Sequence, residues 1–122
     1  MIQLRSFITP ADNCGAKRLQ VMHLYRGFRH RQSGIGDTVL AVVKDALPNS
    51  MVKKKDKVKV VIVRTKKEIG RTDGSHIRFS DNAGVIIDTQ NNPRGTRIFG
   101  PIAREIKDAG FNKIASMAKE VY

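Results

Sequence analysis

The chain has 122 residues, and its 23 lysines and arginines outnumber 11 aspartates and glutamates, which gives a formal net charge of +12 and a pI near 10.4. So strong a positive charge favours a polyanionic partner, either nucleic acid or an anionic membrane surface. The longest apolar run, residues 39–43, is far too short to span a bilayer, and one cysteine excludes an internal disulfide and a cysteine-based zinc site.

The length, with 40% hydrophobic residues, suits one domain with a modest core. No linker, repeat or low-complexity segment divides residues 1–122, so we expect a single domain. Nothing near Met1 resembles a signal peptide, because Arg5 interrupts the sequence before an apolar run forms. These features predict a soluble chain from a reducing compartment, or one that lacks its targeting extension.

The first half of the chain predicts three strands. The first spans residues 2–8 and ends at Thr9-Pro10, and the second spans residues 17–25. Apolar side chains change face near Met22, which indicates a bulge or a strand that is apolar on both sides. A third strand is expected over residues 38–43, between Gly-Asp and Pro-Asn-Ser turn signals.

Residues 58–88 predict two more strands joined by a ribbon. The β-branched run Val60-Val61-Ile62-Val63 favours a buried strand, and residues 85–87 form the next one. Between them, Asp73-Gly74 is a strong hairpin signal, and the piece 77–79 is expected to extend a ribbon. Several short strands separated by turns favour a small barrel or a sandwich.

The last part of the chain changes to a helical pattern. Pro101 suits a first helical turn, Ile102 and Ile106 are spaced to share one face, and Gly110 suits a helix end. A second short helix is expected from about Asn112. Its apolar side would pack into the core, and this side consists of Phe111, Ile114 and Met117.

The positive charge is concentrated in two segments. Residues 52–78 hold ten basic and three acidic residues, and a second cluster at 26–31 contains Arg26, Arg29, His30 and Arg31. A run of lysines is often only a solvated face, but two clusters with so little acidic compensation favour contacts with phosphate. The candidate RNA-binding residues are Lys17, Arg18, Arg29, Arg31, Lys53, Lys54, Lys55, Arg64, Lys66, Lys67, Arg71 and Arg78.

No pattern for catalysis, a cofactor or a metal stands out. The three histidines lack metal-ligand spacing, and residues 34–37 lack the Lys-Ser/Thr of a phosphate-binding loop. Asp12 and Asp37 follow turn residues and are expected to brace backbone N–H groups. Cys14 lies in a polar turn, where we interpret it as a small tolerated side chain. The chain is therefore not expected to be an enzyme.

Ordered motifs carry a family resemblance. They are ADNCGAK at 11–17, GIGD at 34–37, VVIVRTKK at 60–67 with the following DG and IRF, and RGTRIFGP at 94–101. In this order, across nearly the whole chain, they resemble the large-subunit ribosomal protein L-fourteen family. The resemblance implies a mainly β protein, with a small closed five-stranded β-barrel over about residues 1–90, a β-ribbon extension, and a C-terminal loop with short helices over about 91–122.

The resemblance also implies a function and partners. A member would be a structural constituent of the large ribosomal subunit, without enzymatic activity, cofactor, metal or membrane contact. It would bind large-subunit rRNA directly, neighbour proteins L-three and L-nineteen, and form intersubunit bridges to small-subunit rRNA. The family surface matching Thr96, Arg97 and Lys113 also binds a ribosomal silencing factor. Because the few aromatic residues form no evident stacking platform, recognition of RNA shape is favoured.

Two departures from the family pattern stand out. Val60 replaces a smaller residue, which calls for roomier local packing, and Lys119 replaces a proline near the C-terminus. This divergence favours an organellar or a fast-evolving bacterial-type ribosome, so the compartment is the bacterial cytoplasm, a mitochondrion or a plastid. Two other hypotheses are a free-standing basic nucleic-acid chaperone and a barrel-fold RNA-modifying or nucleolytic enzyme, and neither explains the ordered motifs.

Overall fold

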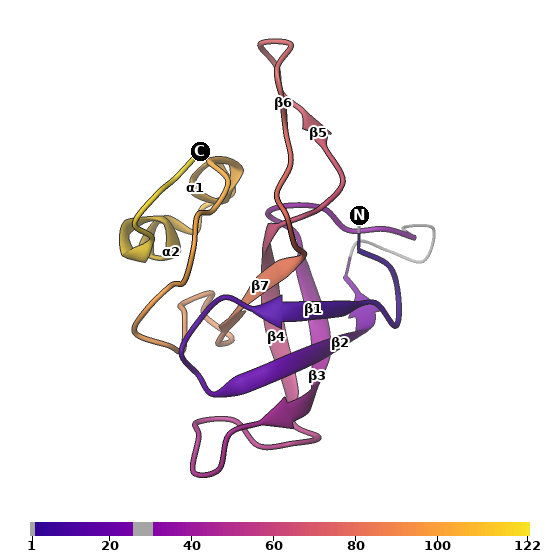
Figure 1. Ribbon diagram of the computed structural model, residues 1–122, viewed down its shortest axis with the longest axis vertical. Coiled ribbons are helices and arrows are strands. Elements are labelled where there is room, and N and C mark those ends of the chain that lie inside the picture. Colours follow the sequence, from indigo (N-terminus) through magenta and orange to yellow (C-terminus); the bar gives the residue numbers. More distant parts are fainter. Residues whose placement is uncertain (1, 26–30) are drawn as a thin grey trace.

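Five strands form a closed barrel in the computed structural model, which describes residues 2–25 and 31–122. Figure 1 shows the barrel with its neighbouring strands in the order β1-β2-β3-β4-β7. The strands are β1 (Phe7–Pro10), β2 (Ala16–Leu24), β3 (Thr38–Ala46), β4 (Lys57–Arg64) and β7 (Ala83–Ile87). Strand β1 closes the barrel because it pairs antiparallel with β2 and parallel with β7. The predicted mainly β fold with a closed five-stranded barrel is confirmed.

The first strand lies later than predicted. It begins at Phe7 and includes Pro10, whereas Ile2 makes only an isolated bridge with Ser33. Arg5 has a positive φ of 67°, which breaks the strand that the apolar pattern suggested. Pro10 is tolerated because the N–H groups on either side of it make the bonds to this edge: Thr9 donates to the carbonyl of Asn82, just before β7, and Ala11 donates to the carbonyl of Gly84 in β7.

The next two strands are close to their predicted ranges. The pairing of β2 with β3 shifts between Val21 and His23, so the predicted irregularity around Met22 is a bulge. Strand β3 continues past its apolar run to Ala46, because its polar end still pairs with the basic start of β2, where Asp45 lies opposite Arg18. The apolar pattern alone could not show this extension, since it lies outside the buried part of the strand.

A two-stranded ribbon follows β4. It consists of β5 (Ile69–Gly70) and β6 (His76–Ile77), which pair antiparallel and extend away from the barrel (Figure 1). At its tip the Gly74 N–H donates to the Arg71 carbonyl, and the Arg71 N–H donates to the Ser75 carbonyl. The hairpin predicted from Asp73-Gly74 is confirmed.

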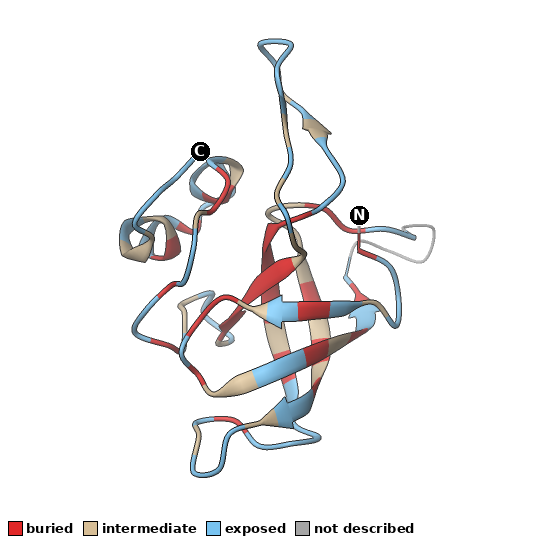
Figure 2. Cartoon of the chain, in the orientation of Figure 1, coloured by how far each residue is buried: buried red, intermediate tan, exposed pale blue. Residues whose placement is uncertain are grey.

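Strands β4 and β7 are buried on both faces and separate two apolar cores (Figure 2). Val60, Ile62 and Ile86 belong to the core cluster inside the barrel. The alternate residues Val61 and Val85 belong to a second cluster, which contains apolar residues of the C-terminal segment. Because strand side chains alternate in direction, one continuous apolar run serves both cores.

Two short helices, α1 (Glu105–Asp108) and α2 (Asn112–Met117), pack in this second core. The expectation that Ile102 and Ile106 share a helical face is wrong, because α1 begins after Ile102. The Ile102 N–H instead donates to the Glu120 carbonyl, so a bridge with the C-terminal tail replaces the first helical turn. Phe111 and Ile114 are buried, as predicted for core packing. Within the described residues no helix is long and apolar enough to cross a membrane.

Gly84 explains how the barrel accepts Val60. A Cβ atom at position 84 would lie 2.4 Å from Val60 Cγ1 and 3.1 Å from the Val61 carbonyl oxygen. Both distances are below ordinary van der Waals contact, so the missing side chain of Gly84 supplies the space that the valine fills.

Candidate nucleic-acid interface

One end of the barrel carries a loop rich in lysine, residues 47–56, which joins β3 to β4. Lys53, Lys54 and Lys55 are all exposed there, and hydrogen bonds from the backbone N–H groups of Lys53 and Lys55 fix the loop. The Lys55 N–H donates to the Val43 carbonyl, and the Lys53 N–H donates to the Asp56 carboxylate at 2.8 Å. The lysine side chains therefore project from a backbone that is itself fixed.

The start of β2 lies beside this loop and adds to its charge. The Leu47 N–H donates to the Gly15 carbonyl, which joins the loop to the residues just before Lys17 and Arg18. Both cations are exposed, and the Arg18 guanidinium lies 3.8 Å from the centre of the Phe7 ring. We call Lys17, Arg18, Lys53, Lys54 and Lys55 the loop-end cluster.

A second group of cations lies where the ribbon leaves the barrel. Lys66, Lys67 and Arg78 are exposed, and we call these three the ribbon cluster. The Lys66 N–H donates to the side-chain oxygen of Asn82, which fixes the first residues after β4 against the start of β7. Strand β4 runs from the loop at residues 47–56 to the base of the ribbon, and Figure 1 shows that loop and the ribbon at opposite ends of the barrel. The loop-end cluster and the ribbon cluster therefore lie at opposite ends of β4.

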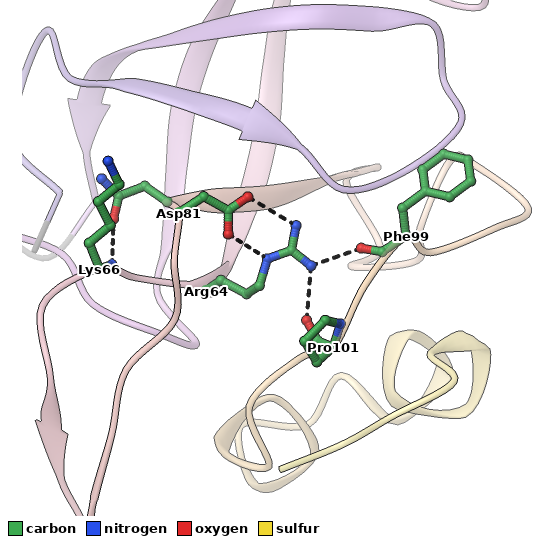
Figure 3. A network of polar contacts seen from close by, with 6 residues as sticks. Arg64, Lys66, Asp81, Phe99 and Pro101 are labelled. Atoms are coloured by element: carbon green, nitrogen blue, oxygen red, sulfur yellow. Dashed lines mark hydrogen bonds and ion pairs between the residues drawn. The ribbon is translucent and has the colours of Figure 1, made fainter.

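Arg64 does not belong to this exposed surface. It is only 7% exposed, and its Nε lies 3.0 Å from Asp81 Oδ1. Its Nη1 donates to the carbonyl oxygens of Phe99 at 2.8 Å and Pro101 at 3.0 Å (Figure 3). The residue was predicted to contact RNA, but its guanidinium instead joins the end of β4 to the segment that leads to the helices.

Gly100 permits this inward arrangement. Its φ is +80°, and a Cβ at this position would lie 2.5 Å from Arg64 Nη1. A side chain there would therefore be strained by the backbone and would also displace the guanidinium. The motif residues Arg64 and Gly100 act together, although they lie far apart in the sequence.

Arg71 also makes an internal contact. Its Nε lies 2.7 Å from Glu105 Oε1, and its Nη2 donates to Oε2 of the same carboxylate at 3.3 Å. The side chains of the two residues are only 15% and 30% exposed. This two-point ion pair ties the ribbon to helix α1, so Arg71 is less available to an external phosphate than Arg78 is.

Thr96 and Arg97 lie exposed on the segment after β7, and Asn13 shapes their backbone. Asn13 Oδ1 accepts the N–H of Thr96 at 2.8 Å and that of Arg97 at 3.2 Å. Asn13 Nδ2 donates to the Thr96 hydroxyl at 2.8 Å. Lys113 is exposed on α2. The role of Asn13 was missed, because only the tertiary structure brings it to this segment.

The remaining predicted cations are Arg29 and Arg31. Arg29 lies outside the described residues, and Arg31 is exposed. The segment that follows Arg31 is fixed at the ribbon end of the barrel, where the Gly36 N–H donates to the Ile62 carbonyl. Asp37 braces this turn by accepting the Gly34 N–H at 2.9 Å, as predicted.

The buried pair of Asp12 and Cys14 is structural. Asp12 Oδ2 accepts the thiol of Cys14 at 3.2 Å and the Ile86 N–H at 3.1 Å, so the predicted bracing role of Asp12 is confirmed. Burial and the nearby Asp12 carboxylate raise the pKa of the Cys14 thiol to about 12. A thiol held in its neutral form is a poor nucleophile, which agrees with its interpretation as a small packed side chain.

The arrangement is a compact barrel with exposed cations at two ends and buried polar anchors between them. Residues 1–122 match the family model for ribosomal protein L14p/L23e. The chain belongs to this family. The match covers the whole chain, so the family resemblance predicted from the ordered motifs is confirmed.

Family membership places the L14p/L23e chain in the ribosome as a structural protein of the large subunit. The family is structural and non-enzymatic, and membership implies association with the large subunit and its rRNA. The buried or bonded polar residues Arg64 and Asn13 therefore belong to the framework that presents the exposed cations.

Proposed function

We propose that this chain binds large-subunit rRNA directly through two exposed cationic clusters and contributes to the interface between the subunits. The observation that supports the rRNA contact most strongly is the exposure of the loop-end and ribbon clusters at opposite ends of β4. With Arg31, and with Arg29 outside the described residues, they would hold folded RNA by its phosphates and riboses. Such contacts position a protein on RNA shape rather than on base sequence.

The intersubunit contact is assigned to Thr96, Arg97 and Lys113. All three residues are exposed, and the backbone of the first two is fixed by Asn13. This surface would form bridges to small-subunit rRNA and would bind a ribosomal silencing factor when the subunits are apart. Proteins L-three and L-nineteen are the proposed protein neighbours. The ribosome would be of bacterial type, in the bacterial cytoplasm, a mitochondrion or a plastid.

Sedimentation tests the integral ribosomal role. Tagged protein from its native extract is washed at high salt and run through a sucrose gradient. We expect retention with the large subunit, because many contacts made together should survive a wash that removes basic proteins held only by nonspecific charge. Release to the top of the gradient would contradict the proposal and would favour a free-standing nucleic-acid chaperone.

A charge reversal tests the intersubunit surface. Arg97→Glu with Lys113→Glu should impair the joining of purified subunits without unfolding the barrel, because both side chains are exposed. The matched control reverses two other exposed cations, with Lys44→Glu and Lys107→Glu, and should join normally. Normal joining by the Arg97 and Lys113 variant would remove the interface assignment.

A further inference from the structure

A groove of about 460 Å³ lies between the ribbon and the C-terminal end of the chain. Figure 1 shows the ribbon and the C-terminus at the same end of the molecule. The ribbon supplies His76, Arg78 and Phe79 to the lining, and the C-terminal segment supplies Pro101 and Tyr122. This volume is within the range of small-ligand sites.

The groove brings together two aromatic residues that are distant in the sequence. The Phe79 N–H donates to the Thr65 carbonyl at 3.0 Å, which fixes its backbone at the base of the ribbon. The Tyr122 N–H donates to the Ile102 carbonyl at 2.9 Å, and the Tyr122 hydroxyl donates to Glu120 Oε2 at 2.6 Å. Tyr122 nevertheless remains 53% exposed. An aromatic ring that is both held and exposed is suited to stacking against a planar ligand.

The charge in the groove is positive on the ribbon side. Arg78 is exposed and has no hydrogen-bond or ion-pair partner among the described residues. Arg71 also lines the groove, but its guanidinium is held by Glu105. The acidic Glu120 bonds to the Tyr122 hydroxyl on the opposite wall. A ligand with one phosphate and one planar ring would therefore place its phosphate near Arg78.

We propose that this groove binds one unstacked nucleotide of RNA, with its base against Phe79 and Tyr122 and its phosphate near Arg78. The proposal rests on the proposed rRNA contact and adds a site that recognises a bulged or looped-out base. Stacking on aromatic side chains is how proteins commonly hold such bases, and cations at the rim supply the affinity for the backbone.

Binding of two matched RNA hairpins by the full chain tests the proposal. One hairpin is fully paired, and the other has the same stem with a single bulged adenosine. We expect the wild-type chain to bind the bulged hairpin about tenfold more tightly, because stacking of one base on an aromatic side chain contributes on that scale. Tyr122→Leu should reduce the ratio of the two affinities to about one, whereas Tyr122→Phe should keep most of it.

Two further variants separate the groove from general effects. Tyr25→Leu removes another exposed tyrosine, 48% exposed and absent from the groove lining, and should leave the preference for the bulged hairpin unchanged. Phe79→Leu tests the ribbon wall and should also abolish the preference. Because Tyr122 is exposed near the end of the chain, its substitution tests the groove even if the Phe79 variant is unstable.

The outcomes distinguish this site from the broader rRNA contact. Equal wild-type affinity for the two hairpins would overturn the nucleotide site and leave the rRNA contact standing, and the groove would then suit a protein neighbour. An undiminished preference in Tyr122→Leu would also overturn it. Failure of the rRNA contact itself would show separately, as release of the chain from the large subunit in the sucrose gradient.

Discussion

The loop at residues 47–56 and the base of the ribbon are both rich in basic residues, but the structure uses their charges differently. In the loop, the three consecutive lysines are all exposed. At the ribbon, Arg64 is buried against Asp81 and two carbonyl oxygens, and Arg71 is paired with Glu105. A basic residue in the sequence is therefore not always a cation at the surface.

The chemistry of the two side chains accounts for the difference. Arginine carries five N–H donors in a planar fork, so a buried guanidinium can bond to a carboxylate and to two carbonyl oxygens together. Lysine carries a compact, strongly hydrated ammonium group, which is costly to bury without several partners. Arginines can thus fix the ribbon and the C-terminal segment, while the loop lysines remain in solvent.

The largest expected effect is on stability, from Arg64→Met. It leaves Asp81 without its cation and the carbonyl groups of Phe99 and Pro101 without their donor. Because Asp81 is 38% exposed and can be partly rehydrated, we expect a loss of about 2–3 kcal/mol of unfolding free energy. Chemical denaturation measures this loss. The control Lys66→Met alters an exposed cation and should change stability by less than about 0.5 kcal/mol.

The loop lysines should show the opposite behaviour. Replacing Lys53, Lys54 and Lys55 together by glutamine should leave the unfolding free energy nearly unchanged. The affinity for rRNA fragments should fall roughly tenfold or more, and the slope of log affinity against log salt should fall by about one for each lost phosphate contact. A variant with Lys44, Lys107 and Lys119 changed to glutamine matches the loss of charge. If both variants weaken binding equally, the loop-end cluster has no special role.

Arg71→Gln should have a smaller effect, because its ion pair is partly exposed. We expect a loss of about 1 kcal/mol or less, together with faster hydrogen exchange of the ribbon amides. Hydrogen exchange resolved by residue would locate the change. Glu105→Gln should produce the same local effect. An unchanged ribbon in both variants would show that the ion pair does not tether it.

The smallest expected effect is the change of stability with pH that comes from the buried carboxyl group of Asp12. Asp81 is paired with Arg64, whereas Asp12 has no cation among its described hydrogen-bond partners, and burial raises the pKa of Asp12. The folded chain therefore holds the Asp12 proton more tightly than the unfolded chain does. Asp12 contributes most to stability at low pH, and this contribution is lost as the pH rises through its folded-state pKa.

Unfolding measurements from about pH 4 to about pH 7 on the wild type and on Asp12→Asn isolate this contribution. Asparagine does not titrate, so the stability of the variant relative to the wild type should increase as the pH rises. A difference that is independent of pH would show that Asp12 titrates alike in both states.

The amino-acid sequence by itself determined the features that depend on neighbouring residues. The β-branched run before Arg64 specified a buried strand, Asp73-Gly74 specified a hairpin, and the pattern after Gly110 specified the short helix α2. The ordered motifs were also sufficient to indicate the family. The strand, the hairpin and the helix need only backbone preferences and periodic burial, which are local properties.

Only the tertiary structure decided what depends on distant partners. The bridge between Ile102 and the C-terminal tail shortened helix α1, and closure of the barrel set the limits of β1. The same long-range packing turned Arg64 inward, brought Asn13 to Thr96, and placed Tyr122 across the groove from the ribbon. A side chain's role depends on the groups that meet it, and no local pattern specifies which distant segments will meet.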